Sequence, residues 1–442
     1  MAKEGVSSDP NESVWWTTKP PYVPLPALDG DVTADIAVLG GGFTGVSSAL
    51  HMAKRFPDKR IVLLEAAHLG SGASGRNGGL MLNWVNGIHT DDTAIAKRIY
   101  DVTRSGIDLI ESTIKEHNLD VSYRRDGCIE VLTDEARAAA AKIEVQKLAS
   151  AGIPLRFVEG DELDSILRFE GVKGAIFDAA AGQVDGVDLL RGLRPVLQKL
   201  GVTIYEGTPV IGIEEGEVVT VKTPNGVVRA GAIVLATNGY TPELGYFKSG
   251  LVPVHSHLIA TEPLPMEEWR EIGWGNVSGF SDDLDRLAYG CMTKSGRLVF
   301  GGGSNDAYSY VFGSRSRFEG SADAGYKAVH DRLLKYLPKA VRVEITHRWT
   351  GTVALTLSRV CTMGVTGKHK NVLYSLGYSG HGITLANLAG KVLTDIYAGD
   401  DEAWRDLPFY SQKLLYVPPE PFRWIGYHVY STLTGKSPRR SL

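Results

Sequence analysis

Two short apolar segments near the start of the chain are separated by a stretch with a helical pattern. Residues 35–39 (DIAVL) and 61–65 (IVLLE) are almost entirely apolar, which is typical of strands buried on both faces of a parallel sheet. Residues 46–56 between them predict a helix. This order predicts the strand–helix–strand opening of a doubly wound domain.

The hydrophobic pattern changes twice further along the chain. Apolar residues recur at helical spacing over residues 93–118, and the alanine-rich residues 135–151 also predict a helix. Between about residues 250 and 347, short alternating runs with turns predict antiparallel strands. From residue 371 the strand–helix pattern returns, with a helix over about 384–397. A chain of 442 residues fits more than one domain.

These shifts predict the fold class α/β (α+β overall), with a Rossmann-type dinucleotide-binding domain and an inserted, mostly antiparallel substrate domain. The expected limits are an extended N-terminal arm over 1–30, a dinucleotide-binding domain assembled from 31–90, 180–245 and 345–410, a substrate or cap domain over 91–179 and 246–344, and a C-terminal tail over 411–442. Four prolines between residues 20 and 26 of the arm argue against a helix there.

Composition narrows the class of protein. The net charge is −4 and no long basic run occurs, so nucleic acid is not an expected partner. Cys128, Cys291 and Cys361 are scattered and form no CxxC pair, which argues against a disulfide framework or a zinc site and predicts no metal. The polar first residues do not resemble a signal peptide, and no apolar run approaches the roughly 20 residues of a membrane helix. We therefore expect a cytoplasmic enzyme.

Residues 40–45 (GGGFTG) match GxGxxG between the first apolar strand and the helix, the context that this motif requires. Gly40 permits a tight turn, Gly42 lets the backbone approach a pyrophosphate, and Gly45 allows close helix–strand packing. Glu65 ends the next strand, where a carboxylate accepts hydrogen bonds from ribose hydroxyls. Residues 301–306 fail to repeat the motif at the last position, so no second, NAD(P)H site is expected.

A second glycine-rich stretch, residues 70–79 (GSGASGRNGG), is longer than a nicotinamide-binding fold needs. It suits a loop that offers backbone N–H groups to a flavin. Here the chain resembles the D-amino-acid-oxidase/glycine-oxidase superfamily of FAD-dependent enzymes, and GASGRNGG is similar to its gamma-glutamylputrescine oxidase-like amine oxidase branch. Residues 236–242 (ATNGYTP), 349–351 (WTG) and 377–384 (GYSGHGIT) agree with that resemblance.

The resemblance implies FAD as the cofactor. The motifs and their flanks give the expected cofactor-binding residues: Gly40, Gly42, Phe43, Thr44, Gly45, Glu65, Ala66, Gly72, Ala73, Ser74, Arg76, Asn77, Gly78, Gly79, Leu80, Val210, Thr237, Gly351, Gly380, His381, Gly382, Ile383 and Thr384. Sarcosine oxidases carry a covalent-flavin Cys whose matching place here is near Gly351, so non-covalent FAD is expected, with Cys361 as the one rival.

Departures from the family pattern at two positions indicate the class of substrate. The carboxylate-binding Arg of glycine oxidases is matched by Val353, and the Lys of sarcosine oxidases is matched by Thr384. These departures favour an amine over an α-amino acid, although a shift in the alignment would bring Arg348 or Arg359 to the carboxylate. The residues expected to carry catalysis are Tyr289, His381, Tyr378 and His255, followed by His257; Lys294 is expected in a solvated turn.

The leading hypothesis is an FAD-dependent amine oxidase. It oxidises a C–N bond to an imine, which hydrolyses to an aldehyde or ketone, and it reduces O₂ to H₂O₂. The alternative is a dehydrogenase of the same fold that passes electrons to a quinone or carrier, with the aromatic C-terminal tail as a docking segment. A third possibility is a scaffold that FAD only stabilises. His381 is either a hydrogen-bond donor to the flavin or a helix cap.

Overall fold

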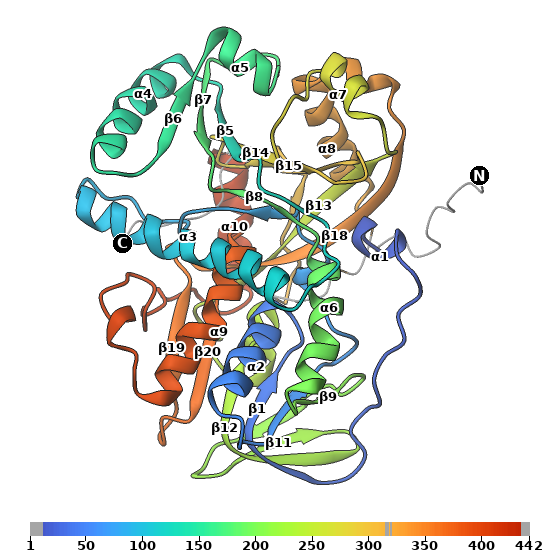
Figure 1. Ribbon diagram of the computed structural model, residues 1–442, viewed down its shortest axis with the longest axis vertical. Coiled ribbons are helices and arrows are strands. Elements are labelled where there is room, and N and C mark those ends of the chain that lie inside the picture. Colours follow the sequence, from blue (N-terminus) through green and yellow to red (C-terminus); the bar gives the residue numbers. More distant parts are fainter. Residues whose placement is uncertain (1–11, 314–317, 319–320, 435–442) are drawn as a thin grey trace.

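The computed structural model describes residues 12–313, 318 and 321–434, and two large sheets organise them (Figure 1). The first sheet, in the lower half of Figure 1, contains β1 (Val32–Leu39), β2 (Ile61–Leu64), β9 (Thr203–Tyr205), β10 (Gly212–Glu214), β11 (Val219–Thr223), β12 (Gly226–Leu235), β19 (Thr362–Thr366) and β20 (Val372–Leu376). Strands β9, β2, β1, β12 and β20 lie in this order and are parallel. Strand β19 and the β10–β11 pair extend the sheet in antiparallel fashion.

Four helices pack around this sheet: α2 (Phe43–Arg55), α3 (Thr93–Glu116), α6 (Gly186–Lys199) and α9 (Gly382–Ala398). The predicted βαβ opening is confirmed by β1, α2 and β2, and the helices expected over 93–118 and 384–397 are α3 and α9. Helices α2 and α9 cross closely, because a Cβ on Gly390 would lie 2.2 Å from Ser47 Oγ. The first half of α2 therefore packs directly against the middle of α9.

The second sheet, in the upper half of Figure 1, is mostly antiparallel. Its strands are β5 (Cys128–Leu132), β6 (Leu155–Val158), β7 (Gly174–Asp178), β13 (Val252–Thr261), β14 (Gly279–Asp282), β15 (Ala288–Met292), β16 (Leu298–Gly302), β17 (Tyr308–Ser309) and β18 (Ile345–Leu355). Strands β5 and β14 form a parallel pair. Helices α4 (Glu135–Ser150), α5 (Gly160–Ile166), α7 (Met266–Ile272) and α8 (Asp323–Tyr336) belong to this half.

Shorter elements complete the described chain. A small sheet joins β3 (Leu80–Met81), β8 (Gly182–Val184) and β4 (Tyr123–Arg124). The 3₁₀ helices are η1 (Ala73–Gly75), η2 (Asn238–Leu244), η3 (Pro338–Arg342) and η4 (Glu402–Trp404). Among the described residues, no helix has the length and apolar character that crossing a membrane requires.

Two elements depart from the expected domain limits. Strand β18 pairs with β13 in the second sheet, although residue 345 was expected to begin a dinucleotide-binding segment. Helix α3 was expected in the substrate domain, but it packs on α9 of the first half, where a Cβ on Gly106 would lie 2.9 Å from Thr384 Cγ2. Both differences arise because long-range packing determines which half of the molecule an element joins. The local sequence pattern does not contain that information.

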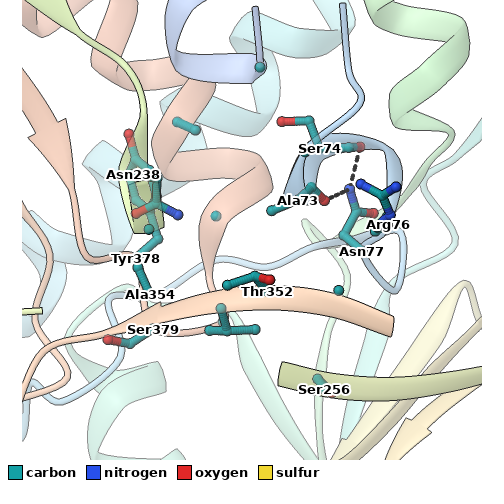
Figure 2. A pocket seen from close by; sticks show the side chains of 18 of the residues that line it. Ala73, Ser74, Arg76, Asn77, Asn238, Ser256, Thr352, Ala354, Tyr378 and Ser379 are labelled. Carbon is teal, nitrogen blue, oxygen red and sulfur yellow. Dashed lines mark hydrogen bonds between the residues drawn. The ribbon is translucent and has the colours of Figure 1, made fainter. Parts of the chain in front are cut away.

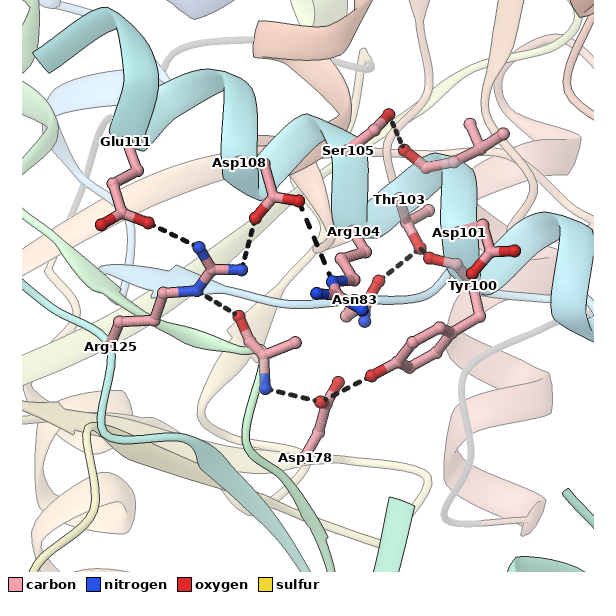
Figure 3. A network of polar contacts seen from close by, with 12 residues as sticks. Asn83, Tyr100, Asp101, Thr103, Arg104, Ser105, Asp108, Glu111, Arg125 and Asp178 are labelled. Atoms are coloured by element: carbon pink, nitrogen blue, oxygen red, sulfur yellow. Dashed lines mark hydrogen bonds and ion pairs between the residues drawn. The ribbon is translucent and has the colours of Figure 1, made fainter. Parts of the chain in front are cut away.

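A polar network also joins α3 to the second half of the molecule (Figure 3). The Tyr100 hydroxyl donates to Asp178 Oδ1 at 3.1 Å. The Arg125 guanidinium forms ion pairs with Asp108 at 2.6 Å and Glu111 at 2.5 Å. Helix α3 therefore links the two halves by an apolar face on α9 and a polar face toward β7.

Both ends of the described chain form helices. The arm expected to be extended contains α1 (Val14–Thr17), because Val14 and Trp15 find a buried site ahead of Pro20. In the tail, α10 (Phe422–Thr434) buries Tyr427 and Ser431, whose hydroxyls each accept a hydrogen bond from Arg286 at 3.0 Å. The tail thus packs on its own protein with this face. Residues 1–11 and 435–442 lie outside the described residues.

Candidate functional site

A cavity of about 1280 Å³ is lined by residues from both sheets. Figure 2 looks into it, with the loop that carries Ala73 and Asn77 on one side, Asn238 and Tyr378 on the other, and Thr352 of β18 below. Four sequence motifs meet here because they follow neighbouring parallel strands: Gly40 follows β1, Glu65 follows β2, Ala236 follows β12 and Tyr378 follows β20. Ligands of doubly wound sheets bind at this carboxyl edge.

The first glycine motif makes close contacts that exclude side chains. Gly40 has a φ of +107°, and a Cβ there would lie 2.8 Å from the Ala236 carbonyl oxygen. A Cβ on Gly45 would lie only 1.8 Å from the Gly40 carbonyl oxygen, so any side chain would push α2 away from β1. The roles predicted for Gly40 and Gly45, a tight turn and close helix–strand packing, match this geometry.

Glu65 is fixed beside the beginning of α2. Its Oε2 accepts a hydrogen bond from the Gly41 N–H at 2.7 Å. Its Oε1 accepts from the Ala67 N–H at 2.9 Å and from the Ser71 hydroxyl at 3.1 Å. The carboxylate borders the cavity with a set orientation, as an acceptor for ribose hydroxyls requires.

The second glycine-rich loop is held by side chains from distant segments. The Asn77 amide donates to the Ser74 carbonyl at 2.7 Å, as Figure 2 shows. The Trp15 indole N–H donates to the Asn77 carbonyl at 2.8 Å, and that of Trp349 donates to the Arg76 carbonyl at 3.0 Å. Trp349 explains the tryptophan of the WTG motif. Trp15 was missed because its segment was expected to be extended, and the apolar pair WW ahead of the prolines was the available signal.

His381 lies immediately before the first residue of α9, at the rim of the cavity. Burial lowers the pKa of its imidazole to about 4, so the ring is neutral at pH 7. Its Nδ1 is buried and has no hydrogen-bond partner among the described residues. A ligand atom at the cavity would satisfy Nδ1, and the N-terminus of α9 would favour negative charge there.

These features fit FAD. Glycine backbone lies where a pyrophosphate must approach, a fixed carboxylate stands beside it, and an unsatisfied imidazole nitrogen and a helix N-terminus lie across the cavity. Of the expected cofactor-binding residues, all line the cavity except Gly45, Gly79 and Thr384. Gly79 packs against Trp15 and Cys291, and Thr384 packs against Gly106 of α3.

Alternation along β13 separates the residues expected to face the substrate. Val254, Ser256 and Leu258 line the cavity, so His255 and His257 point to the opposite face. His255 is fully buried and its Nδ1 lies 3.1 Å from Thr352 Oγ1. The placement of His255 in the substrate site is therefore corrected: it is a core residue, and so is His257.

The two tyrosines also differ. Tyr289 of β15 lines the cavity, its ring packs on the Gly78 backbone, and its hydroxyl lies 2.9 Å from Ser256 Oγ. Burial raises the Tyr289 pKa to about 12, so the hydroxyl stays protonated. The Tyr378 hydroxyl instead contacts Thr44 Oγ1 at 2.6 Å and Ser375 Oγ at 2.7 Å, beneath the cofactor loops. Tyr378 lines the cavity as well, but these two contacts engage its hydroxyl.

The structure separates the candidates for a carboxylate partner. Val353 and Arg359 line the cavity, whereas Arg348 is exposed outside it. Lys294 is exposed in the turn between β15 and β16, as expected. Cys361 is buried and is not among the cavity-lining residues, which removes it as a rival for covalent attachment.

The second sheet adds cavity-lining residues that no motif marked, among them Glu130 of β5, Ser281 of β14 and Arg286. One signal was present for Glu130, which is the only charged residue in the otherwise apolar run CIEVL. Their approach to the cofactor loops depends on strand pairing between distant segments, which the sequence pattern does not state.

Known proteins share this fold over most of the chain. The sequence is 31% identical to gamma-glutamylputrescine oxidoreductase of Escherichia coli (strain K12) over 427 residues, covering 93% of this chain and 95% of that protein. The crystal structure of glycine oxidase from Geobacillus kaustophilus superposes with a TM-score of 0.74 at 20% identity, covering 87% of this chain and all of that chain. L-proline dehydrogenase from P. horikoshii gives a TM-score of 0.70 at 21% identity, covering 87% and 96%.

The family profile described as "DAO: FAD dependent oxidoreductase" matches residues 35–396. This span contains all four motifs that meet at the cavity. The predicted resemblance, the fold class and the cofactor are confirmed: the chain belongs to the DAO family of FAD-dependent oxidoreductases.

Proposed function

We propose that this enzyme oxidises the C–N bond of an amine that carries no carboxylate on the reacting carbon. The overall reaction converts the amine and O₂ to an imine and H₂O₂, and water then hydrolyses the imine to an aldehyde or ketone. The proposal rests on family membership, which supports a C–N donor, and on the cavity wall.

One observation supports the absence of a substrate carboxylate. The place of the carboxylate-binding Arg in the glycine-oxidase pattern is Val353, and this residue lines the cavity on β18, next to Thr352. A planar carboxylate needs a bidentate cation, which an apolar side chain does not provide. The relative from Escherichia coli agrees, because its name specifies a putrescine derivative, which is an amine.

FAD, when bound, supplies hydride acceptance from the carbon next to nitrogen. The chain's own residues orient the amine and keep the site apolar. Tyr289 forms one wall through its ring, while its hydroxyl is occupied by Ser256. His381 remains neutral at pH 7, so it adds no positive charge to repel a protonated amine approaching the cavity. Catalysis here is mainly a matter of placing the reacting C–H group.

The electron acceptor is assigned by the same reasoning. Two stretches match GxGxxG, residues 40–45 and 70–75, and both contribute to the same cavity. A second dinucleotide site elsewhere is therefore not expected, and we propose O₂ as the acceptor. The fold alone does not select O₂, because both an oxidase and a dehydrogenase superpose on it.

A panel of amines, N-methyl amines and α-amino acids tests the proposal. Each compound is added without oxygen, and the flavin absorbance near about 450 nm is followed. We expect carboxylate-free amines to bleach this band and admitted air to restore it with one H₂O₂ per turnover. Bleaching that persists in air would assign the dehydrogenase alternative, and a panel without any bleaching would overturn the proposed reaction.

An α-amino acid is the second candidate, because Arg359 lines the same cavity. In that case Arg359→Gln should raise KM for amino acids by about tenfold or more, since a charge-assisted contact is lost. Under the leading proposal the same variant leaves kcat/KM for monoamines within about twofold.

A further inference from the structure

A row of directly opposed residues crosses the second sheet toward the cavity. Leu258 of β13 pairs with Gly301 of β16, Gly301 with Tyr289 of β15, Tyr289 with Ser281 of β14, and Ser281 with Glu130 of β5. Directly opposed residues present their side chains on the same face of a sheet. Tyr289, Ser281 and Glu130 all line the cavity, so the row forms a continuous strip of its wall.

Gly301 makes room for this arrangement. A Cβ at that position would lie 2.7 Å from the Tyr289 ring. The tyrosine therefore occupies the space above the glycine and borders the cofactor loop at Gly78. Neighbouring strands are about 4.8 Å apart, so Glu130 lies two strands, or about 10 Å, from Tyr289 along the wall.

Glu130 is an isolated charge in an apolar strand. Its neighbours Ile129 and Val131 are buried on the other face of β5, while its own side chain is exposed to the cavity. Within the described part of the chain, its carboxylate forms no hydrogen bond and no ion pair, and the Ser281 hydroxyl is likewise without a hydrogen bond. Two polar groups on adjacent strands thus line the cavity without a hydrogen-bond partner among the described residues.

The charges around Glu130 are mostly of the same sign. Asp283 pairs with Arg137 at 3.0 Å, and Asp282 accepts from the Tyr336 hydroxyl at 2.6 Å. Burial, followed by repulsion from Asp283, Asp282 and Glu144, raises the Glu130 pKa to about 7, and Arg137 opposes this rise. Asp282 and Asp283 already have partners, whereas Glu130 lacks a cation, and a ligand ammonium would supply one.

We propose that Glu130, with the Ser281 hydroxyl beside it, binds a second, positively charged amino group of the substrate. The substrate class is then a diamine or N-substituted diamine whose far ammonium lies about 10 Å from the tyrosine wall of the reaction site. This inference rests on the proposed amine oxidation, because the reacting amino group is assigned there. The spacing of the strands in the second sheet would then select substrates by the distance between their two amino groups.

The test compares 1,8-diaminooctane with 1-aminooctane, which lacks the far ammonium. In the wild-type enzyme we expect kcat/KM to favour the diamine by about tenfold or more, as for a charge-assisted hydrogen bond. In Glu130→Gln this preference should fall to about twofold or less with the monoamine unchanged. Glu268→Gln, an exposed residue of α7, is the matched control and should keep the full preference.

Calorimetric titration separates this inference from the proposed reaction. If neither compound bleaches the flavin, the oxidation is wrong, yet the binding of 1,8-diaminooctane to wild type and Glu130→Gln still reports on the subsite. A Kd that weakens about tenfold in the variant supports the subsite. Equal Kd values, or a diamine preference that survives in Glu130→Gln, would overturn it.

Discussion

The two walls of the cavity are built by different means. The wall from the first sheet is rich in glycine backbone: a Cβ on Gly40 or Gly42 would lie 2.8 Å or 2.9 Å from neighbouring atoms. The wall from the second sheet is made of side chains such as Tyr289 and Glu130, brought together by strand register. Under the proposed function, the first wall holds the cofactor and the second selects the substrate.

The contrast explains why only the first wall carries recognisable sequence motifs. A backbone wall tolerates few residues, so it leaves glycines at fixed spacing. A side-chain wall tolerates many residues, and its chemistry depends on which strands pair. Substitutions in the first wall should therefore remove the cofactor, whereas those in the second should retain FAD and change turnover or substrate choice.

The largest effect is expected for Gly42→Val. A Cβ on Gly42 already lies 2.9 Å from Ser74 Oγ, and a branched side chain would enter the space of the pyrophosphate. We expect the purified variant to lose FAD by at least about tenfold, measured as the absorbance ratio of flavin to protein. Gly192→Ala in α6 is the control, because its Cβ meets only ordinary contacts at 3.5 Å. A fully yellow Gly42→Val protein would contradict the assignment of the motif.

Tyr289→Phe probes the opposite wall. The variant keeps the ring and loses the hydroxyl contact with Ser256. We expect full FAD content with kcat/KM lowered by about three- to tenfold, as for one neutral hydrogen bond. Tyr416→Phe, an exposed tyrosine, should match wild type in the same assay. Loss of FAD from Tyr289→Phe would show that this wall also holds the cofactor.

A smaller effect is expected from pH. The Glu130 pKa is raised to about 7, so the carboxyl is neutral below that pH and negative above it. The preference for 1,8-diaminooctane over 1-aminooctane should therefore increase severalfold between about pH 6 and about pH 8. Taking the ratio of the two amines cancels the titration of the reacting amino group. The same ratio should stay flat in Glu130→Gln, and a parallel rise there would assign the titration to another group.

The smallest effect on turnover is expected for His255→Gln. This residue faces away from the cavity and contacts Thr352 and the Phe318 ring. We expect kcat/KM within about twofold of wild type and a free energy of unfolding lowered by about 1–3 kcal/mol, measured by urea denaturation. A tenfold loss of kcat/KM at unchanged stability would restore His255 to the reaction site.

The sequence predicted the first half of the molecule better than the second. The βαβ opening and helices α3 and α9 followed from local apolar pattern, and the glycine motifs identified the cofactor. The membership of β18 in the second sheet did not follow, because it depends on pairing with β13 far along the chain.

The sequence also did not predict which residues of β13 face the cavity. A shift of one residue exchanges the two faces of a strand, and this shift separates His255 in the core from Ser256 in the cavity. Tyr289 was placed correctly at the cavity, while Glu130 was missed because its position depends on the parallel β5–β14 pair.

The reacting carbon of the proposed substrate carries no carboxylate. The most direct measurement compares pentylamine with each enantiomer of norleucine, which is pentylamine with a carboxylate on that carbon. The rate of anaerobic bleaching near about 450 nm is recorded against concentration for each compound. We predict a bimolecular rate constant for pentylamine at least about tenfold above that of either enantiomer. Faster bleaching by norleucine would contradict the account and assign Arg359 as the carboxylate partner.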